Sequence, residues 1–483
     1  MSVKSCNEEW TEQKLRQLFE KSSDVQIHMF HSLMLLYAEG LCDSSQLSKV
    51  IYPELNRIFQ ENKVESIVCE QLLGPLPIHR FEQETEEEII KSVFQGDLVI
   101  LCTTENVLFK LHINNRPERS PEESSIEISI KGPRDGFVED IAINVALIRK
   151  RIRSTSLCCE PFLLGKRTQT KVRLLYIDDI LAPAILQEVR TRLNNIDVDG
   201  LFSINQLEEA LGDIKYPLFP LLDSTGRPDF AVNSLLAGRF VIIIDGNPLV
   251  LVGPATLGLI LKSPEDIHFS FQYISFARLI RLFSFWFAIL LPGLWVALTA
   301  FHQDQIPFRL MATMAVSRLG LPLPAQLEMF VLLLLLEIFR EAGVRLPSSI
   351  GQTLTVIGAL VIGDAAIRSG FISPSVVVVG AITAVMGVTL VNQTLSTIVS
   401  VLRFSIFLLS SILGMYGLIL GLILLLFYMA RLRSFGVAYF VPLSPLNIKE
   451  LPWAYLRLPW SWLKYRPESL NPTDPDHKGD EEH

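Results

Sequence analysis

The spacing of apolar residues divides the chain into three parts. Residues 10–73 carry apolar side chains at helical spacing, as in IHMFHSLMLLYAEGL, and GPLP at 74–77 ends that pattern. From residue 88 the pattern is mixed: a short helix in EEEIIKSVFQG precedes two apolar strands around a turn in LVILCTTENVLFKLHI. The third part, beyond residue 270, is dominated by long uncharged runs.

The mixed unit occurs twice. VFQGDLVILCTTENVLF (93–109) aligns without a gap on LLAGRFVIIIDGNPLVL (235–251), and both place a glycine, Gly96 or Gly238, between helix and strand. Chance reuse of a common unit is one explanation, but spacing retained over seventeen positions favours two related α/β subdomains. Between the copies, KVRLLYID (171–178) predicts a strand and APAILQEVRTRLNNI (182–196) a helix.

The third part predicts membrane helices. Residues 282–301 contain no charge over twenty positions, enough to cross the hydrocarbon core, and 404–428 is a second clear span. Residues 371–391 predict a third span and the glycine-rich stretch 350–367 a shorter fourth. The stretch 326–343 has a short apolar centre and several charges, so it is re-entrant, interfacial or buried within an oligomer.

Flanking arginines predict that both chain ends are cytoplasmic. Arg278 and Arg281 precede the first span, and Arg431 and Arg433 follow the last. An even number of crossings is then required: four, or six if 303–325 also takes part. Beyond residue 435, tryptophan and tyrosine alternate with basic residues, which suits the headgroup layer, and 471–483 is acidic, Pro-rich and predicted to be disordered.

Composition sharpens this division. The mean hydropathy is +0.35 with 19% charged residues, and no lysine occurs between Lys262 and Lys449. The net charge of −8 argues against nucleic-acid binding. All six cysteines lie in the first 159 residues without metal-ligand spacing, which favours a reduced, cytosolic setting. His28 and His31 lie three apart, but helix packing explains them better than a metal site.

The predicted fold is an α/β cytosolic region of two subdomains followed by an all-α multi-span membrane domain. No phosphate-binding loop, dinucleotide fingerprint or catalytic triad is present, so we expect neither enzymatic activity nor a cofactor. The expected divisions are a variable helical N-terminal segment (1–75), a first α/β subdomain with a linker helix (76–155), a second α/β subdomain (156–270), a membrane domain of about four to six helices (271–435) and an amphipathic and acidic cytosolic tail (436–483).

Six motifs resemble one known family. They are KGPRDGFVEDIAINVALIRKRIR (131–153), RPD with SLLAGRFVIIIDGNP (227–248), SPED (263–266), FHQ (301–303), EIFREAGVRLPSSIGQTL (337–354) and VIGDAAIRSGFISP (361–374). Their order is similar to that in the spore germinant receptor A-subunit family, also called the GerA family. The most specific positions are Gly132, Pro133, Arg134, Gly136, Phe137, Glu139, Asp140, Asn144, Arg149 and Arg151.

This resemblance implies a multi-pass protein of the spore inner membrane that contacts membrane lipid. It would act with a transporter-like B subunit that binds the nutrient and with a lipoprotein C subunit. As a homo-oligomer it would form a nutrient-gated channel for monovalent cations that starts germination. Two alternatives stay open: a stage V AF-type companion of the dipicolinate release apparatus, and a non-conducting membrane scaffold for the nutrient-binding subunit.

The segment 131–153 contains a predicted helix. Asp135 can cap its N-terminus, and Phe137, Ile141, Val145, Ile148 and Ile152 form an apolar stripe. The basic residues that complement its C-terminus are Arg149, Lys150, Arg151 and Arg153. It is either a well-capped helix linking the subdomains or an element that also transmits a gating motion.

Charged and small residues mark the candidate pore or gate. Glu337, Arg340 and Glu341 share one helical face, which is either solvated or lines a cation vestibule around a subunit ring.

In the glycine-rich helix that follows, pore lining competes with tight packing inside one subunit; its candidate residues are Gln352, Thr355, Gly358 and Gly363. Asp364 and Arg368 are four apart and can neutralise each other on a helix. Because Gly370 and Pro374 predict a turn after them, they form a predicted pore-mouth pair near the membrane surface.

Overall fold

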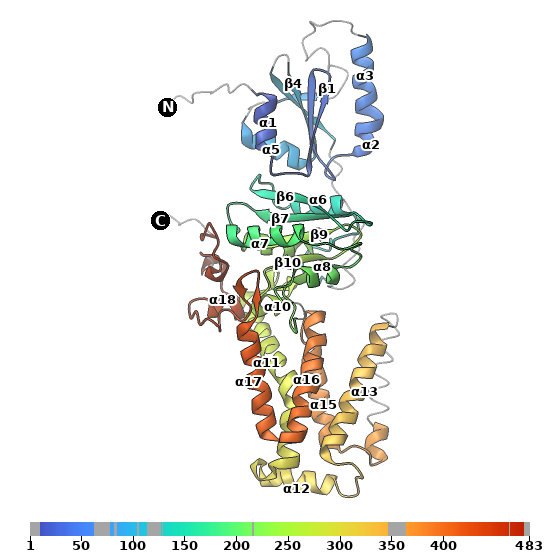
Figure 1. The fold of residues 1–483 in the computed structure, drawn as a ribbon, viewed down its shortest axis with the longest axis vertical. Helices are drawn as coiled ribbons and strands as arrows, with labels where there is room; N and C mark the ends of the chain where they lie inside the picture. The colour runs from blue at the N-terminus through green and yellow to red at the C-terminus, as the bar shows by residue number, and fades with distance from the viewer. Residues whose placement is uncertain are drawn as a thin grey trace.

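Two sheets and a helical bundle follow one another along the long axis of the molecule (Figure 1). The computed structural model of the chain describes residues 10–61, 78–81, 85–103, 106–113, 127, 129–214, 217–345, 364–462 and 464–477. The C-terminal tail lies at the end of the bundle that faces the sheets (Figure 1).

The first sheet has five antiparallel strands in the order β1-β2-β4-β5-β3. The strands are β1 (Val25–Phe30), β2 (Leu33–Ala38), β3 (Ile78–Arg80), β4 (Asp97–Cys102) and β5 (Val107–His112). The helices of this region are α1 (Glu12–Leu18), α2 (Ser44–Gln46), α3 (Tyr52–Glu61) and α5 (Glu86–Gln95), with a π-helical turn at Leu47–Ile51. The prediction for 86–112 is confirmed.

The prediction of helical structure over residues 25–38 was wrong, because this stretch is the hairpin β1–β2. Leu33 and Leu35 pack on one face of the sheet with α3, whereas Met34 and Leu36 pack on the other with α1 and α5. A strand buried on both faces shows no alternation of apolar and polar residues, so its pattern resembles that of a buried helix. His28 lies on β1 and His31 in the turn, so they share no helical face.

The second sheet repeats the first in strand order, β6-β7-β9-β10-β8, again antiparallel. Its strands are β6 (Leu157–Leu164), β7 (Thr170–Ile177), β8 (Asp223–Thr225), β9 (Phe240–Ile244) and β10 (Val250–Gly253). One face is covered by α6 (Ile141–Arg149) and α9 (Pro228–Leu236), and the other by α7 (Pro183–Asn194) and α8 (Ile204–Leu211). The predicted strand at 171–178 and helix at 182–196 are confirmed as β7 and α7.

The sequence repeat corresponds to equivalent elements of the two sheets. The first copy is α5, β4 and β5, and the second is α9, β9 and β10. Gly96 and Gly238 have φ of 92° and 90°, a left-handed conformation that favours glycine after a helix. The match in spacing therefore reflects the same local structure in both sheets.

The helical region follows a short helix, α10 (Leu257–Ile260), and a 3₁₀ turn at Pro264–Ile267. Its helices are α11 (Phe271–Val296, extended by a π-helical turn to Phe301), α12 (Phe308–Ser317), α13 (Ala325–Arg345), α15 (Pro374–Val388), α16 (Gln393–Leu413) and α17 (Met415–Arg431). Two described helices, Phe271–Phe301 and Gln393–Leu413, are long and apolar enough to cross a membrane. The predicted span 282–301 lies within the first of them.

The predicted single span at 404–428 was wrong, because it contains the end of α16 and most of α17. Gly414 separates the two helices with φ 62° and ψ −138°, a conformation open to glycine, and apolar side chains on both sides hide this break from a hydropathy pattern. The predicted span 371–391 contains α15, and the charged stretch 326–343 lies within the continuous helix α13. Most of the predicted span 350–367 lies outside the described residues.

One apolar core joins the second sheet to the bundle. It contains residues of α6 and α9 together with Phe285 of α11, Val399 of α16 and Leu425 of α17. The ring of Phe219 lies 6.3 Å from that of Phe285 and 5.7 Å from that of Tyr439. The second sheet is thus packed directly on the helices.

The C-terminal tail also packs against the second sheet. It contains β11 (Arg433–Ser434), β12 (Val437–Ala438), α18 (Leu451–Tyr455) and 3₁₀ turns at Trp460–Trp462 and Glu468–Leu470. The prediction of disorder was wrong for 471–477: the amide of Thr473 donates to the carbonyl of Ile180 at 2.9 Å, and Arg466 pairs with Asp474 at 2.7 Å. The first of these contacts joins residues far apart in the sequence. Residues 478–483 lie outside the described part.

The cysteines only partly match the expectation of a reduced setting. Cys42, Cys158 and Cys159 are free and buried. Cys102 is disulfide-bonded, which the sequence did not indicate.

Candidate functional site

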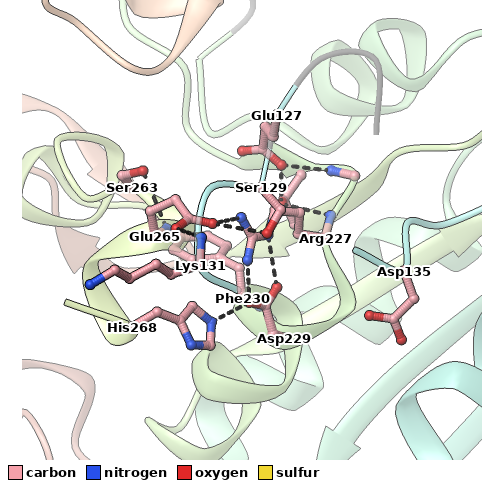
Figure 2. Close-up of polar contacts among 12 residues, drawn as sticks. Glu127, Ser129, Lys131, Asp135, Arg227, Asp229, Phe230, Ser263, Glu265 and His268 are labelled. Atoms are coloured by element: carbon pink, nitrogen blue, oxygen red, sulfur yellow. Dashed lines mark hydrogen bonds and ion pairs between the residues drawn. The ribbon is translucent and has the colours of Figure 1, made fainter. Parts of the chain in front are cut away.

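A buried arginine, Arg227, organises the charged cluster in Figure 2. It precedes α9 and is 2% exposed. Its guanidinium pairs with Asp229 at 2.6 Å and also with Glu265, and Asp229 accepts a further contact from His268 at 2.9 Å. The RPD and SPED motifs, 36 residues apart between their first positions 227 and 263, therefore meet through ion pairs.

The segment leading into α6 wraps around this cluster. Glu127 accepts hydrogen bonds from Thr225 Oγ1 (2.7 Å) and the amide of Gly226 (3.0 Å). The amide of Lys131 donates to Glu265 at 3.1 Å. A Cβ at Gly132 would collide with the Arg227 guanidinium and lie 2.8 Å from His268 Cδ2, so the close approach requires glycine here. The glycine of the GPR motif thus admits the buried arginine.

The carboxyl group of Glu265 in this cluster stays ionised at neutral pH. Burial alone would raise the pKa of Glu265, but hydrogen bonds from Arg227 and from the amide of Lys131 outweigh it and lower that pKa to about 2. Among the residues that the structure describes, no group of three or more His, Cys, Asp or Glu side chains is arranged to hold a metal ion. The arrangement is chemically suited to joining segments by charge.

Asp266, the neighbour of Glu265, makes the contacts to α11 and to the C-terminal tail. It accepts from Arg278 Nε at 2.8 Å and from Arg281 Nη1 at 3.1 Å, both on α11. The guanidinium of Arg457, from the tail, donates to the carbonyls of Asp266, Ile267 and Phe269. Residues 263–266, the junction segment, therefore connect the second sheet, the start of α11 and the tail.

The helix predicted after residue 135 is capped differently from the prediction. Asp140, not Asp135, caps α6 by accepting from the amides of Ala142 (2.8 Å) and Ile143 (3.3 Å). Asp135 instead pairs with Arg151 at 2.7 Å, because the segment between them folds back before the helix begins. Asn144 is buried and bonds both backbone groups of Val138 (2.8 and 2.6 Å). The predicted apolar stripe from Phe137 to Ile152 is buried.

Arg149 connects the two sheet regions. Its side chain is fully buried and bidentate on Asp24, with Nε and Nη2 at 2.7 and 2.9 Å, and it also reaches Ser22 Oγ at 3.2 Å. The guanidinium lies 4.2 Å from the ring centre of Phe94. The sequence assigned Arg149 to its own helix end; its main partner lies 125 residues away in the chain.

The remaining motif positions take less central places. Pro133, Arg134 and Gly136 lie in the segment between Gly132 and α6. Near the end of this segment, the carbonyl of Glu139 accepts a hydrogen bond from the amide of Gly246 at 2.7 Å. These contacts hold the entry to α6 against the β9–β10 turn.

Glu337 of α13 pairs inside the chain. It contacts Arg340 on its own helix and Arg403 of α16 at 3.1 Å. The side chain of Arg403 is 6% exposed. This cross-helix contact was not predicted, because Arg403 lies inside an apolar run. The predicted charged face therefore binds α16, whereas Glu341 is exposed.

Asp364 and Arg368 form the predicted pair, with Arg368 Nε 2.8 Å from Asp364 Oδ2. Both side chains are exposed. The turn after them is confirmed, since Gly370 has φ 68° and Pro374 begins α15. Gln352, Thr355, Gly358 and Gly363 lie outside the described residues.

A second contact between sheet and bundle was missed in the sequence. Asn392 caps α16 by accepting from the amide of Leu395 at 2.9 Å, and its Nδ2 donates to Asp223 Oδ1 of β8 at 2.7 Å. An asparagine just before an apolar run is a signal for a cap, but nothing in the sequence identifies its partner.

The buried carboxyl group of Asp223 is expected to make the stability of the fold depend on pH. Burial, and after it the nearby Glu127, raise its pKa to about 7; burial likewise raises the pKa of Glu208 to about 7. Since the folded chain holds protons that the unfolded chain loses near pH 4, the free energy of unfolding decreases as pH rises from about 4 to about 7, by a few kcal/mol. In Asp223→Asn we expect about half of that decrease, measured by chemical unfolding in detergent across this pH range.

The control for this prediction is Asp197→Asn, which changes an exposed ion pair. It should keep the slope of the unmodified chain. A slope in Asp223→Asn equal to that of the control would contradict the assignment to Asp223.

Known proteins are similar to this chain over nearly its whole length. The family model described as Bacillus/Clostridium GerA spore germination protein matches residues 13–469. Spore germination protein XA of Bacillus anthracis is 39% identical over 476 residues, covering 96% of each chain. Spore germination protein GerLA of Bacillus cereus is 35% identical over 449 residues, covering 92% of this chain and 90% of its own.

A solved structure is also similar to the N-terminal half. The N-terminal domain of the A subunit of the Bacillus megaterium spore germinant receptor GerK3 is 26% identical, with a TM-score of 0.40. The match covers 53% of this chain and 99% of that domain.

Proposed function

The chain belongs to the GerA family of spore germination proteins, and from this we propose that it is the A subunit of a nutrient germinant receptor. In this proposal it crosses the inner spore membrane several times with both termini in the cytoplasm. It acts with a transporter-like B subunit that binds the nutrient and with a lipoprotein C subunit. Copies of the chain assemble into a channel for monovalent cations, and nutrient binding to the B subunit opens it.

The observation that carries the proposal is the junction segment. Glu265 is fixed to Arg227 at the start of α9, and the next residue, Asp266, is fixed to Arg278 and Arg281 on α11. Two adjacent carboxylates thus bind different elements, one the start of α9 and the other α11. A displacement of the second sheet is therefore passed to α11. Because α11 packs in the same apolar core as α16 and α17, its movement changes the bundle.

The outer surface of the bundle supports a membrane location. The exposed side chains of α16 and α17 include Ile412, Tyr416, Ile419, Ile423 and Phe427. Contiguous exposed apolar surface on a soluble protein would favour aggregation, whereas lipid or neighbouring copies cover it at no such cost. The sheets and the tail lie at one end of this bundle, in keeping with cytoplasmic termini (Figure 1).

The channel is tested by measuring currents from the purified chain in planar bilayers. We expect cation-selective conductance from an oligomer, and a few-fold lower preference for cations in Glu341→Gln, since this change removes an exposed negative charge from the proposed vestibule. Glu12→Gln, an exposed position on α1, serves as the control. An oligomer that inserts but passes no current would instead favour the non-conducting scaffold.

A further inference from the structure

A cavity of about 360 Å³ lies where the C-terminal tail folds against the second sheet region. Its walls come from α10, from Arg239 and Lys262, and from α18 and the residues after it. Figure 1 shows α10 and α18 together at the end of α11 that faces the sheets. None of the contacts of the junction segment uses this cavity.

Two basic residues of the wall, Arg239 and Lys262, stand out by their contacts. Arg239 is 7% exposed, and its Nε donates to the carbonyl of Pro254 at 3.1 Å. Within the described part of the chain, neither Arg239 nor Lys262 forms an ion pair. Burial, and after it the nearby cations Arg278 and Arg239, lower the pKa of Lys262 to about 7. Basic side chains without an ion pair in a partly buried wall favour the binding of an anion.

The acids of the cavity wall already have other partners. Glu450 accepts from the amide of Ser469 at 2.8 Å, and Glu468 accepts from Asn447 Nδ2 at 3.2 Å. These carboxylates hold the tail in place. The basic residues of the wall, Arg239, Lys262, Lys449 and Arg466, outnumber these two acids.

Aromatic side chains complete the wall. Trp453 and Tyr465 both line the cavity. They belong to the tail stretch whose alternation of aromatic and basic residues suits a headgroup layer. The wall thus combines positive charge with apolar surface, the usual composition of a site for an amphiphilic anion.

We propose that this cavity binds a phosphate- or carboxylate-bearing group of a partly apolar molecule, with Arg239 and Lys262 as its cationic ligands. A guanidinium and an ammonium together provide charge-assisted hydrogen bonds to such an oxyanion. Either an anionic lipid headgroup of the adjacent leaflet or a soluble anion supplies this chemistry. The lipid source depends on the membrane location proposed above; the anion site itself does not.

The test is calorimetric titration of the full chain in uncharged detergent with two probes, dihexanoyl phosphatidylglycerol and inorganic phosphate. The variants are Lys262→Gln and Arg239→Gln. Lys464→Gln, an exposed lysine outside the cavity wall, is the matched control. We expect binding by the unmodified chain and the control, and roughly tenfold weaker binding in each cavity variant.

The two probes separate the sources. Binding of the short-chain lipid without competition from phosphate identifies a lipid headgroup, whereas equally strong phosphate binding identifies a soluble anion; both support the site. If neither probe binds, or if Lys262→Gln binds as tightly as the control, the proposal is wrong. Should Arg239→Gln fail to fold, Lys262→Gln decides alone, because it removes a half-buried charge next to a cavity. The result of this titration does not depend on whether the chain acts in germination, so it can fail or succeed independently of the proposed function.

Discussion

Replacing Arg149 with methionine is expected to lower the free energy of unfolding by about 3–5 kcal/mol, the cost of leaving a buried charge without its partner. Asp24 is 4% exposed, and its two carboxylate oxygens each accept a hydrogen bond from Arg149. Methionine keeps most of the side-chain volume, so the loss reports the charge. Chemical unfolding of the purified chain in detergent measures it.

Two further variants show whether the pair is responsible. Arg16→Met breaks an exposed pair on α1 and should cost less than about 1 kcal/mol. In Arg149→Met combined with Asp24→Leu, most of the lost stability should return, because no charge is left buried. If the double variant is as unstable as Arg149→Met alone, the buried charge is not the cause.

Replacing Asp266 with asparagine is expected to reduce nutrient-triggered cation release from spores at least tenfold, on the order of the loss of one charge-assisted hydrogen bond that couples the junction segment to α11. The variant removes the charge that fixes Arg278 and Arg281 to the junction segment, but leaves Glu265 and its contacts to the second sheet intact. Cation release is followed by flame photometry of the medium after nutrient addition.

The control for this variant is Glu188→Gln, which weakens an exposed pair of α7, where Arg192 keeps its contact with Asp213. Spores with this control should release cations normally. Immunoblotting must show equal amounts of both variants in spore membranes. Normal release with Asp266→Asn at equal amount contradicts a coupling role for the junction segment.

The sequence predicted those elements whose conformation depends on residues close together in the chain. The repeated unit is recognisable because glycines at 96 and 238 end their helices in a left-handed conformation and apolar strands follow at fixed distance. The Asp364–Arg368 pair follows from helical spacing alone. The same reasoning failed for the hairpin at 25–38, where β2 is buried on both faces and shows no alternation, and for the break at Gly414, where apolar residues on both sides conceal the turn.

The connections between regions could not be derived from the sequence. Asp24 and Arg149, Asp223 and Asn392, and Glu337 and Arg403 are each brought together by the tertiary fold. The motifs RPD and SPED were recognised by resemblance, but their contact through Arg227 and Glu265 becomes visible only when α9 and the junction segment are placed side by side. The sequence shows which charged residues would need partners if buried, whereas only the tertiary structure shows which residues those partners are.

The most direct test of the proposed receptor function is the rate of cation release from nutrient-exposed spores of a strain lacking this chain. We expect release in response to at least one nutrient to be lost, to return with the unmodified chain, and to stay absent with Asp266→Asn. Release from the deletion strain at the parental rate for every nutrient to which the parent responds would contradict a role for this chain as a germinant receptor subunit.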